Sequence, residues 1–312
     1  MGTSEGEGRA EAWWRVPLLV LVCAVLWGSA FPGIKYVYGE WGSEVGLEVR
    51  LAFAGFRFML AGLMLVPLRG NPLVAVSSET WRGLVLLALS QTFVQYVLFY
   101  TGLAVSGGIL GSLLVSAGSF WWVLLAPLIL KTPRPTRLQW AGLVLCAVGM
   151  ALAVWRPGAG AGDPLLGAGC FLGSSFSGAV GVVMMAKLGA GVRPTHATSL
   201  SLFSGGVLLA LCGVRGWGDF FGLMEVKTTV VTVYLAAVSA SAFALWNTLV
   251  KQYSANLLAG YRFLIPLSGV VLSAVFIPGE AVGLGTFLGG LLVVGAVVVV
   301  NRRRGGRMVE RK

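Results

Sequence analysis

Three basic side chains lie inside long apolar stretches of the sequence, where a charge is costly and is therefore a candidate for function. They are Lys35, Arg57 and Arg262. Each arginine lies roughly 12 Å along its stretch, at about 1.5 Å per helical residue, and its fork of N–H donors could bind a substrate carboxylate. Helix-end carbonyls, a lipid headgroup or a neighbouring helix are the alternative partners. For Lys35, which lies near an end of its stretch, the alternative is a side chain that extends to water.

Uncharged polar side chains interrupt two other apolar stretches. Gln91, Gln95 and Tyr96 lie in one stretch, and Trp246 and Asn247 lie in another. Gln91 and Gln95 are four residues apart and so share one face of a helix. Such groups are costly against lipid, so they either line a cavity or form hydrogen bonds between helices. We favour the cavity, because the sequence contains an internal repeat, described below, in which these two stretches stand at the same position of each half.

Aromatic residues complete the candidate site. Trp27 is ten residues into its stretch, too deep for the belt of Trp and Tyr that forms at a membrane surface, and such a belt is the alternative for the other rings. Pro32 is a candidate hinge, because proline removes a backbone hydrogen bond and can bend a helix, although a static kink is an equal alternative. The predicted substrate-binding residues are Trp27, Phe31, Gln91, Gln95, Tyr96, Phe176, Trp246, Asn247, Tyr261 and Arg262, with Lys35 and Arg57 as further charged candidates.

Patterns typical of catalysis or metal binding are absent from the sequence. It contains one histidine and four isolated cysteines, with no metal-ligand spacing, nucleotide-binding glycine loop or nucleophile–base pair. We therefore expect no catalytic residue, no metal and no cofactor. An intramembrane hydrolase or transferase is the alternative, but such an enzyme needs an activated nucleophile or clustered His, Asp or Glu.

The composition indicates what surrounds these residues. Of the 312 residues, 57% are hydrophobic and 11% are charged, and the mean hydropathy is +0.85. Soluble domains carry roughly 25% charged residues, so the sequence predicts an integral membrane protein with the lipid bilayer as a partner. The net charge of +11 does not indicate nucleic-acid binding, because the basic residues lie mostly between the apolar stretches, as membrane topology requires.

Ten apolar stretches are long enough to cross a bilayer as helices of about 20 residues. They indicate helices rather than barrel strands, because the apolar runs are continuous and do not alternate with polar residues. The sequence thus predicts an all-α membrane protein with ten transmembrane helices, at residues 17–37, 49–68, 83–102, 108–130, 137–155, 164–186, 196–214, 229–250, 255–276 and 282–301.

The distribution of Lys and Arg predicts the orientation of these helices. With a cytoplasmic N-terminus, 16 Lys and Arg lie on the cytoplasmic side and 4 lie on the other side. Ten helices then return the C-terminus to the cytoplasm. We expect a multi-pass protein of the cytoplasmic (inner) membrane, with residues 1–16 and the basic residues 302–312 as cytoplasmic tails.

An internal repeat divides the chain into two halves. The segment Gly28–Gly33 (GSAFPG) matches Gly173–Gly178 (GSSFSG). Residues 17–155 and 164–301 therefore form two repeats of five helices each. Because five is odd, the second repeat begins on the opposite side of the membrane and the repeats are inverted. This arrangement is typical of secondary transporters, whose substrate site lies between the two halves.

Several motifs resemble the drug/metabolite transporter superfamily, EamA type. They are LWGSAFPGIK at residues 26–35, FRFMLA at residues 56–61, FLIPLSG at residues 263–269, and Gly279-Glu280. The resemblance covers about residues 18–301 and implies a ten-helix, inverted-repeat carrier that usually exports amino acids or related small metabolites. In one departure, Lys131-Thr132 stands where the first half would carry the equivalent of Gly279-Glu280.

The predicted function is secondary transport of small polar metabolites such as amino acids, in the export direction, by alternating access around a central cavity. No carboxylate or histidine lies in the middle of a predicted span, which favours facilitated diffusion or exchange over proton coupling. A proton-coupled drug or metabolite antiporter is the alternative, with Glu48 or Lys35 carrying the proton. A channel is a third interpretation, but the sequence contains no filter-like loop and no pattern that would form a ring of charged side chains. A small-molecule substrate is the expected partner. The sequence does not determine the oligomeric state, and a monomer is compatible with the predicted architecture.

Overall fold

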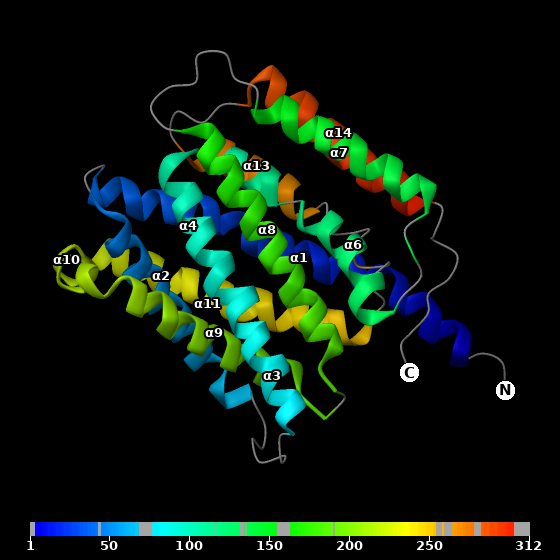
Figure 1. Cartoon of the computed structure of the whole chain (residues 1–312), viewed down its shortest axis with the longest axis horizontal. Coiled ribbons are helices and arrows are strands. Elements are labelled where there is room, and N and C mark those ends of the chain that lie inside the picture. The colour runs from blue at the N-terminus through cyan, green and yellow to red at the C-terminus, as the bar shows by residue number, and fades with distance from the viewer. Residues whose placement is uncertain are drawn as a thin grey trace.

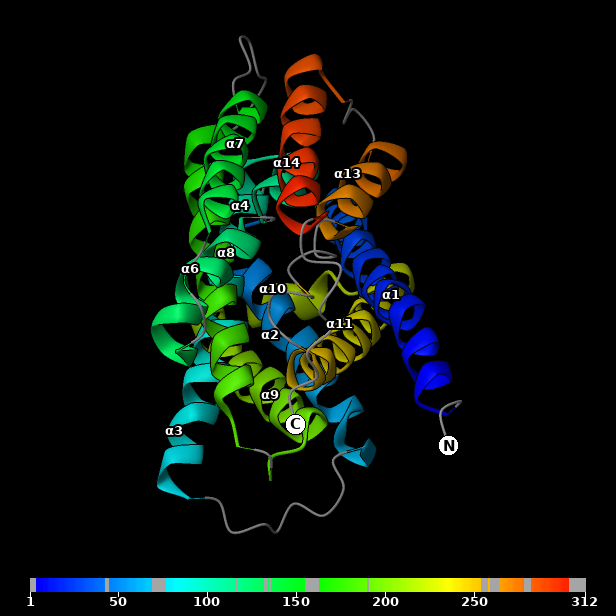
Figure 2. The same ribbon diagram turned by 90° about the vertical axis from the view of Figure 1, so that its right-hand side faces the viewer.

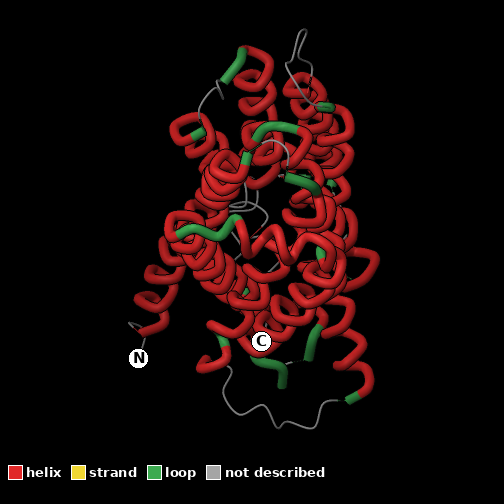
Figure 3. Tube along the Cα trace, turned by 90° about the vertical axis from the view of Figure 1, so that its left-hand side faces the viewer, coloured by secondary structure: helices red, strands yellow, loops and turns green. Residues whose placement is uncertain are grey.

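The structure is a bundle of helices (Figure 1). The computed structural model describes residues 4–42, 45–68, 77–115, 117–131, 134, 136–154, 163–189, 191–253, 258, 264–277 and 282–302. Within these ranges the chain forms helices joined by short loops, and no strand (Figure 3). The helices are α1 (Ser4–Trp41), α2 (Leu47–Met64), η1 (Val66–Leu68), α3 (Ser78–Leu87), η2 (Ala88–Val94), α4 (Gln95–Val105), α5 (Gly108–Val115), α6 (Gly118–Leu130), α7 (Arg137–Val154), α8 (Pro164–Lys187), α9 (Pro194–Cys212), η3 (Val214–Gly216), α10 (Trp217–Gly222), α11 (Val226–Gln252), α13 (Leu264–Phe276) and α14 (Leu284–Arg302).

Several helices begin at residues that satisfy the free N–H groups of a first turn. The Asp163 carboxylate accepts the backbone N–H groups of Leu165 and Leu166, at 3.1 and 3.0 Å, and Pro164 occupies the first position of α8, where no N–H is needed. Glu225 and Thr228 form a capping box at the start of α11. These local signals fix where the apolar helices start.

Seven helical segments of the described chain are long and apolar enough to cross a membrane, as judged by length and composition. Large apolar side chains such as Leu128 and Val226, which are 78% and 81% exposed, face outward. Such an apolar surface is favourable in contact with lipid and unfavourable in contact with water. The chain is therefore an integral, multi-pass membrane protein. The seven segments are Val16–Trp41, Leu47–Leu68, Ser78–Val105, Gly108–Leu130, Pro164–Lys187, Pro194–Cys212 and Val226–Gln252.

The remaining three predicted spans overlap α7, α13 and α14. Part of the predicted span 255–276 lies outside the described residues, so the count of ten spans stays a prediction. The helix of the first span begins at Ser4 rather than at residue 17, and its first turns extend beyond the bundle (Figure 2).

Helices from the two halves of the chain pack against each other throughout the bundle. The most extensive contacts join α2 to α9, α7 to α14, α1 to α13, and α4 to α8. The α7–α14 pair lies at one end of the molecule, away from α2, α9 and α11 (Figures 1 and 2).

Glycine lets α2 and α9 approach closely. A Cβ built at Gly62 would lie 2.6 Å from the backbone nitrogen of Phe203, and one built at Gly206 would lie 2.6 Å from the backbone nitrogen of Met59. Both neighbouring atoms belong to the backbone, which cannot shift to make room as the end of a flexible side chain would. Small residues at membrane-helix interfaces commonly permit such backbone contact.

Two helices have features that bear on the predictions. The segment Ala88–Val94 is a π-helix between α3 and α4, a form that is rare and often found at functional sites. The predicted span 83–102 therefore contains a wider turn that its spacing did not reveal. By contrast, α1 continues through Pro17 and Pro32 without interruption, and the hinge role of Pro32 stays a prediction.

Candidate functional site

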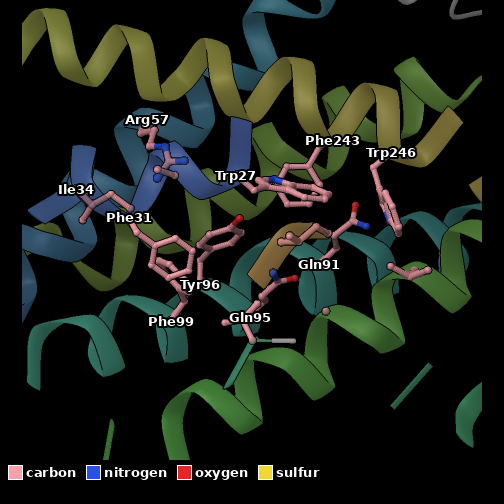
Figure 4. Close-up of a pocket in the computed structure, with 15 residues that line it drawn as sticks. Trp27, Phe31, Ile34, Arg57, Gln91, Gln95, Tyr96, Phe99, Phe243 and Trp246 are labelled. Carbon is pink, nitrogen blue, oxygen red and sulfur yellow. The ribbon is translucent and has the colours of Figure 1, made fainter. Parts of the chain in front are cut away.

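A cavity of about 80 Å³ lies between α1, α2, η2, α4, α5, α8, α11 and α13. Both halves of the chain therefore contribute to its wall. Figure 4 shows aromatic rings around most of the space, interrupted by the polar side chains of Arg57, Gln91 and Gln95. The aromatic lining residues are Trp27, Phe31, Tyr96, Phe99, Phe243 and Trp246, and the smaller apolar ones are Ala30, Ile34, Val115, Gly178, Val182 and Ile265.

The rings of the wall pack edge to face. The centroid of Trp27 lies 5.2 Å from that of Phe243 and 5.7 Å from that of Trp246, with interplanar angles of 72° and 62°. Phe31 and Phe99 are related in the same way at 5.4 Å. Such T-shaped pairs are the favoured arrangement of aromatic side chains and hold one another in place. The wall is thus a preformed apolar surface.

Trp27 also brings a polar group to this wall. Its indole Nε1–H is buried and has no hydrogen-bond partner among the described residues. An indole nitrogen can only donate, and a buried donor without an acceptor costs free energy. A side chain of the wall therefore carries a buried donor that has no acceptor among the described residues.

Arg57 is the basic side chain that the structure places in the wall. It is 1% exposed. Its Nε donates to the Leu235 carbonyl at 3.1 Å, Nη1 donates to the Tyr100 hydroxyl at 2.7 Å, and Nη2 donates to the Ser239 hydroxyl at 2.8 Å. These three bonds tie α2 to α4 and α11. All three acceptors are neutral oxygens, so the residues that the structure describes solvate the positive charge without neutralising it.

Gln91 belongs to a second hydrogen-bonded group. Its Nε2 donates to Asn247 Oδ1 at 3.2 Å, and Asn247 Nδ2 donates back to Gln91 Oε1 at 3.0 Å and to the Thr198 hydroxyl at 2.8 Å. This network joins η2, α11 and α9. In the view of Figure 4, Trp27 and Phe243 lie between Arg57 and Trp246.

Gln95 and Tyr96 follow the π-helix and face the cavity from α4. The Gln95 amide lies against Gly178, where a Cβ would come within 2.7 Å of Gln95 Oε1. Glycine at that position leaves room for the amide beside α8. The Tyr96 hydroxyl points into the space between Phe31 and Trp27 (Figure 4).

Seven of the predicted residues meet in this wall: Trp27, Phe31, Arg57, Gln91, Gln95, Tyr96 and Trp246. Asn247 lies behind the wall and touches it through Gln91. Phe176 lies elsewhere: it is 44% exposed and packs on Trp121 at 5.4 Å. Lys35 Nζ donates to the Ser106 carbonyl at 2.9 Å and is not part of the wall. Tyr261 and Arg262 lie outside the described residues.

Phe99 and Phe243 are wall residues that the sequence analysis missed. The spacing along each helix could have identified both residues. Phe99 is four residues after Gln95, and Phe243 is three residues before Trp246, so each shares a helix face with a predicted residue. Within the described residues, no three His, Cys, Asp or Glu side chains form a group that could hold a metal ion.

A bundle of apolar helices around a central cavity built from both halves of the chain is the architecture of a membrane transporter. The EamA-like transporter family matches residues 14–155 and, a second time, residues 165–302. The chain belongs to this family, within the drug/metabolite transporter superfamily.

Full-length relatives carry names of the same kind. The chain is 28% identical over 298 residues to "Uncharacterized transporter YvbV" of Bacillus subtilis (strain 168), covering 93% of this chain and 92% of the relative. It is 25% identical over 291 residues to "Probable amino-acid metabolite efflux pump" of Escherichia coli (strain K12), covering 89% and 91%. A solved crystal structure matches 93% of this chain and 99% of its own with a TM-score of 0.65 at 15% identity, which shows a shared fold. Family and relatives point to a transporter rather than an enzyme.

Proposed function

We propose that the protein is a secondary transporter that exports small polar metabolites such as amino acids by alternating access around the described cavity. The observation that carries this proposal is the cavity itself, in which aromatic walls from both halves surround Arg57, Gln91 and Gln95. Mostly apolar walls with a few placed polar groups are typical of small-molecule sites. The efflux activity in the name of the Escherichia coli relative supports the export direction.

The proposed architecture is ten transmembrane helices in two inverted repeats of five. The double family match supports two repeats. The helix packing supports their symmetry: if the halves are exchanged, the contact of α1 with α11 becomes that of α8 with α4, and the contact of α1 with α13 becomes that of α8 with α6. All four contacts are present. The α2–α9 and α7–α14 contacts map onto themselves.

The two polar networks are proposed to hold the cavity closed at its two ends. The Arg57 network joins α2, α4 and α11, and the Gln91 network joins η2, α11 and α9. The cavity of about 80 Å³ is smaller than the roughly 300–1,000 Å³ of ordinary ligand pockets. Substrate entry therefore requires helices to separate, and separation at one network at a time would give alternating access.

The proposed location is the cytoplasmic membrane with both termini in the cytoplasm. The excess of Lys and Arg in the loops assigned to that side supports it. Transport is proposed to proceed by facilitated diffusion or exchange, since no wall residue among those described is Asp, Glu, His or Lys.

Uptake by proteoliposomes tests the proposal. Purified protein is reconstituted, the vesicles are preloaded with an unlabelled amino-acid mixture, and entry of each labelled amino acid is followed as counterflow. We expect counterflow of at least one compound, reduced by about tenfold or more in Trp246→Ala and Gln95→Ala. Ser204→Ala is the matched control, because its exposed hydroxyl bonds only within its own helix. Unchanged counterflow in both folded wall variants would place the site elsewhere.

A further inference from the structure

Arg57 carries a positive charge that no carboxylate of the described chain neutralises. Its partners are the Leu235 carbonyl and the hydroxyls of Tyr100 and Ser239. A buried charge is ordinarily paired, because desolvation without a counter-ion is expensive. Here the uncompensated charge lies in the wall of a cavity, so an anion entering the cavity would supply the missing partner.

The hydrogen-bonding capacity of the wall favours the same kind of ligand. Arginine presents five N–H donors, and three of those of Arg57 have protein acceptors among the described residues. Two donors remain, and the buried Nε1–H of Trp27 is a further donor without an acceptor. Both side chains can only donate, so the group that they receive must accept several hydrogen bonds. A carboxylate has two oxygens that do so.

The rest of the cavity is suited to an apolar body. Rings of Trp27, Phe31, Phe99 and Phe243 and the side chains of Ile34 and Val182 enclose most of it. No described wall residue is acidic, so an ammonium group on the ligand would find no carboxylate there. The field of Arg57 would in addition oppose a ligand whose net charge is positive.

We propose that Arg57 is the anion-binding residue of the transport site, and that the substrates are small carboxylates with an apolar or aromatic body. The carboxylate receives the two remaining guanidinium donors and the Trp27 Nε1–H, and the body packs among the rings. This inference rests on the proposed transport function and narrows its substrate class.

Binding by matched ligand pairs tests the proposal with the wild-type chain. The probes are 3-phenylpropanoate with 3-phenylpropanamide, and L-phenylalanine with L-phenylalaninamide; 3-phenylpropylamine is the cationic control. Each amide keeps the body and loses the carboxylate. Affinities are measured on the purified full chain by ligand-dependent thermal stabilisation. In at least one pair we expect the acid to bind about tenfold or more tightly than its amide, and the amine to bind most weakly.

Variants of Arg57 assign the preference to this side chain. Arg57→Gln should reduce the acid-to-amide preference to about twofold or less, while Arg57→Lys should keep part of it. Arg50→Gln is the matched control: it removes the same charge from the same helix, at a residue that donates to the Val45 carbonyl and lies over the Tyr38 ring. Trp27→Phe keeps a ring and removes only the N–H donor, and it should reduce the preference by about threefold. This variant and the wild-type ratios test the proposal even where Arg57→Gln does not fold.

Three results would overturn the proposal: equal binding of acid and amide in both pairs, absence of binding by both acids, or an acid preference that survives in folded Arg57→Gln. Counterflow with the same probes separates this proposal from the proposed function. Transport of an amide or amine without transport of either acid would leave a transporter and refute the carboxylate class. Acid-selective binding without any counterflow would leave the anion site and refute transport.

Discussion

The side-chain amides of Gln91 and Asn247 hydrogen-bond each other in both directions, at 3.2 and 3.0 Å. Both residues are at most 2% exposed. Gln91 belongs to the π-helix between α3 and α4, and Asn247 belongs to α11. The pair therefore connects one half of the chain to the other beside the cavity, and the Thr198 hydroxyl extends it to α9.

A double-mutant cycle measures the strength of this pair. Gln91→Leu or Asn247→Leu alone leaves a buried amide without its partner, so each should lower the free energy of unfolding by about 1–3 kcal/mol. The double variant should lose less than the sum, with a coupling of about 0.6–1.7 kcal/mol, as for other hydrogen bonds between membrane helices. Unfolding of the purified chain in detergent gives the four values. Additive losses would mean that the two amides do not interact.

Close packing of α2 and α9 leads to a second prediction. Gly206→Ala places a methyl group against the backbone of Met59 and should lower the free energy of unfolding by about 1–3 kcal/mol. Gly169→Ala in α8 is the control, because a Cβ there meets no atom within 4 Å. It should be neutral or stabilising by up to about 1 kcal/mol, since alanine favours helix. Equal thermal stability of the two variants would refute close packing at Gly206.

The positions of the helices followed from the sequence because burial in a bilayer imposes a simple requirement on length and apolarity. A helix lies in each predicted range, and α8 and α11 begin within three residues of their predicted starts. The π-helix at Ala88–Val94 was not foreseen. Apolar periodicity is weak in helices that are apolar all round, so one added residue in a turn leaves no clear signal there.

The wall residues could be predicted where polarity or depth was unusual, as for Gln91, Gln95 and Trp27. Phe176 shows the limit of reasoning from the repeat, which paired it with Phe31. Gly178 and Gly181 bring α8 close to Gln95 of α4 and Gln91 of η2, and Ser174 is buried on the same helix. Phe176 is two residues from both Ser174 and Gly178, about 200° around the helix, and so points away from that contact. The closest packing contacts of a helix decide which of its faces turns toward the cavity. A motif match between the two repeats contains no information about those contacts.

A deletion tests the role of the π-helix in positioning Gln91. Removal of Val94, which is 41% exposed, takes one residue from the wider turn and should restore regular α-geometry. A π-turn accommodates its added residue locally, so Gln95, Tyr96 and Phe99 beyond it should keep their facing, whereas Gln91 within it should rotate away from Asn247. We expect the deletion to lower the free energy of unfolding by about 1–3 kcal/mol, because buried amides lose their partner, whereas Val94→Ala should behave as wild type. Unfolding of the purified chain in detergent measures both, and wild-type stability of the deletion variant would show that the added residue does not position Gln91.

Coupling to ions gives the last prediction. Of the described wall residues none is Asp, Glu, His or Lys, the side chains that commonly carry protons in transporters. The described wall therefore offers no such carrier, and a carboxylate substrate would cross the membrane with its own negative charge. An imposed pH gradient should not concentrate substrate in proteoliposomes beyond the level that it produces in protein-free liposomes, whereas a potassium diffusion potential should change the rate of net flux. Glu48, in the first turn of α2, is the alternative proton carrier. If a pH gradient alone concentrated substrate and Glu48→Gln abolished the effect, transport would be proton-coupled and Glu48 would carry the proton.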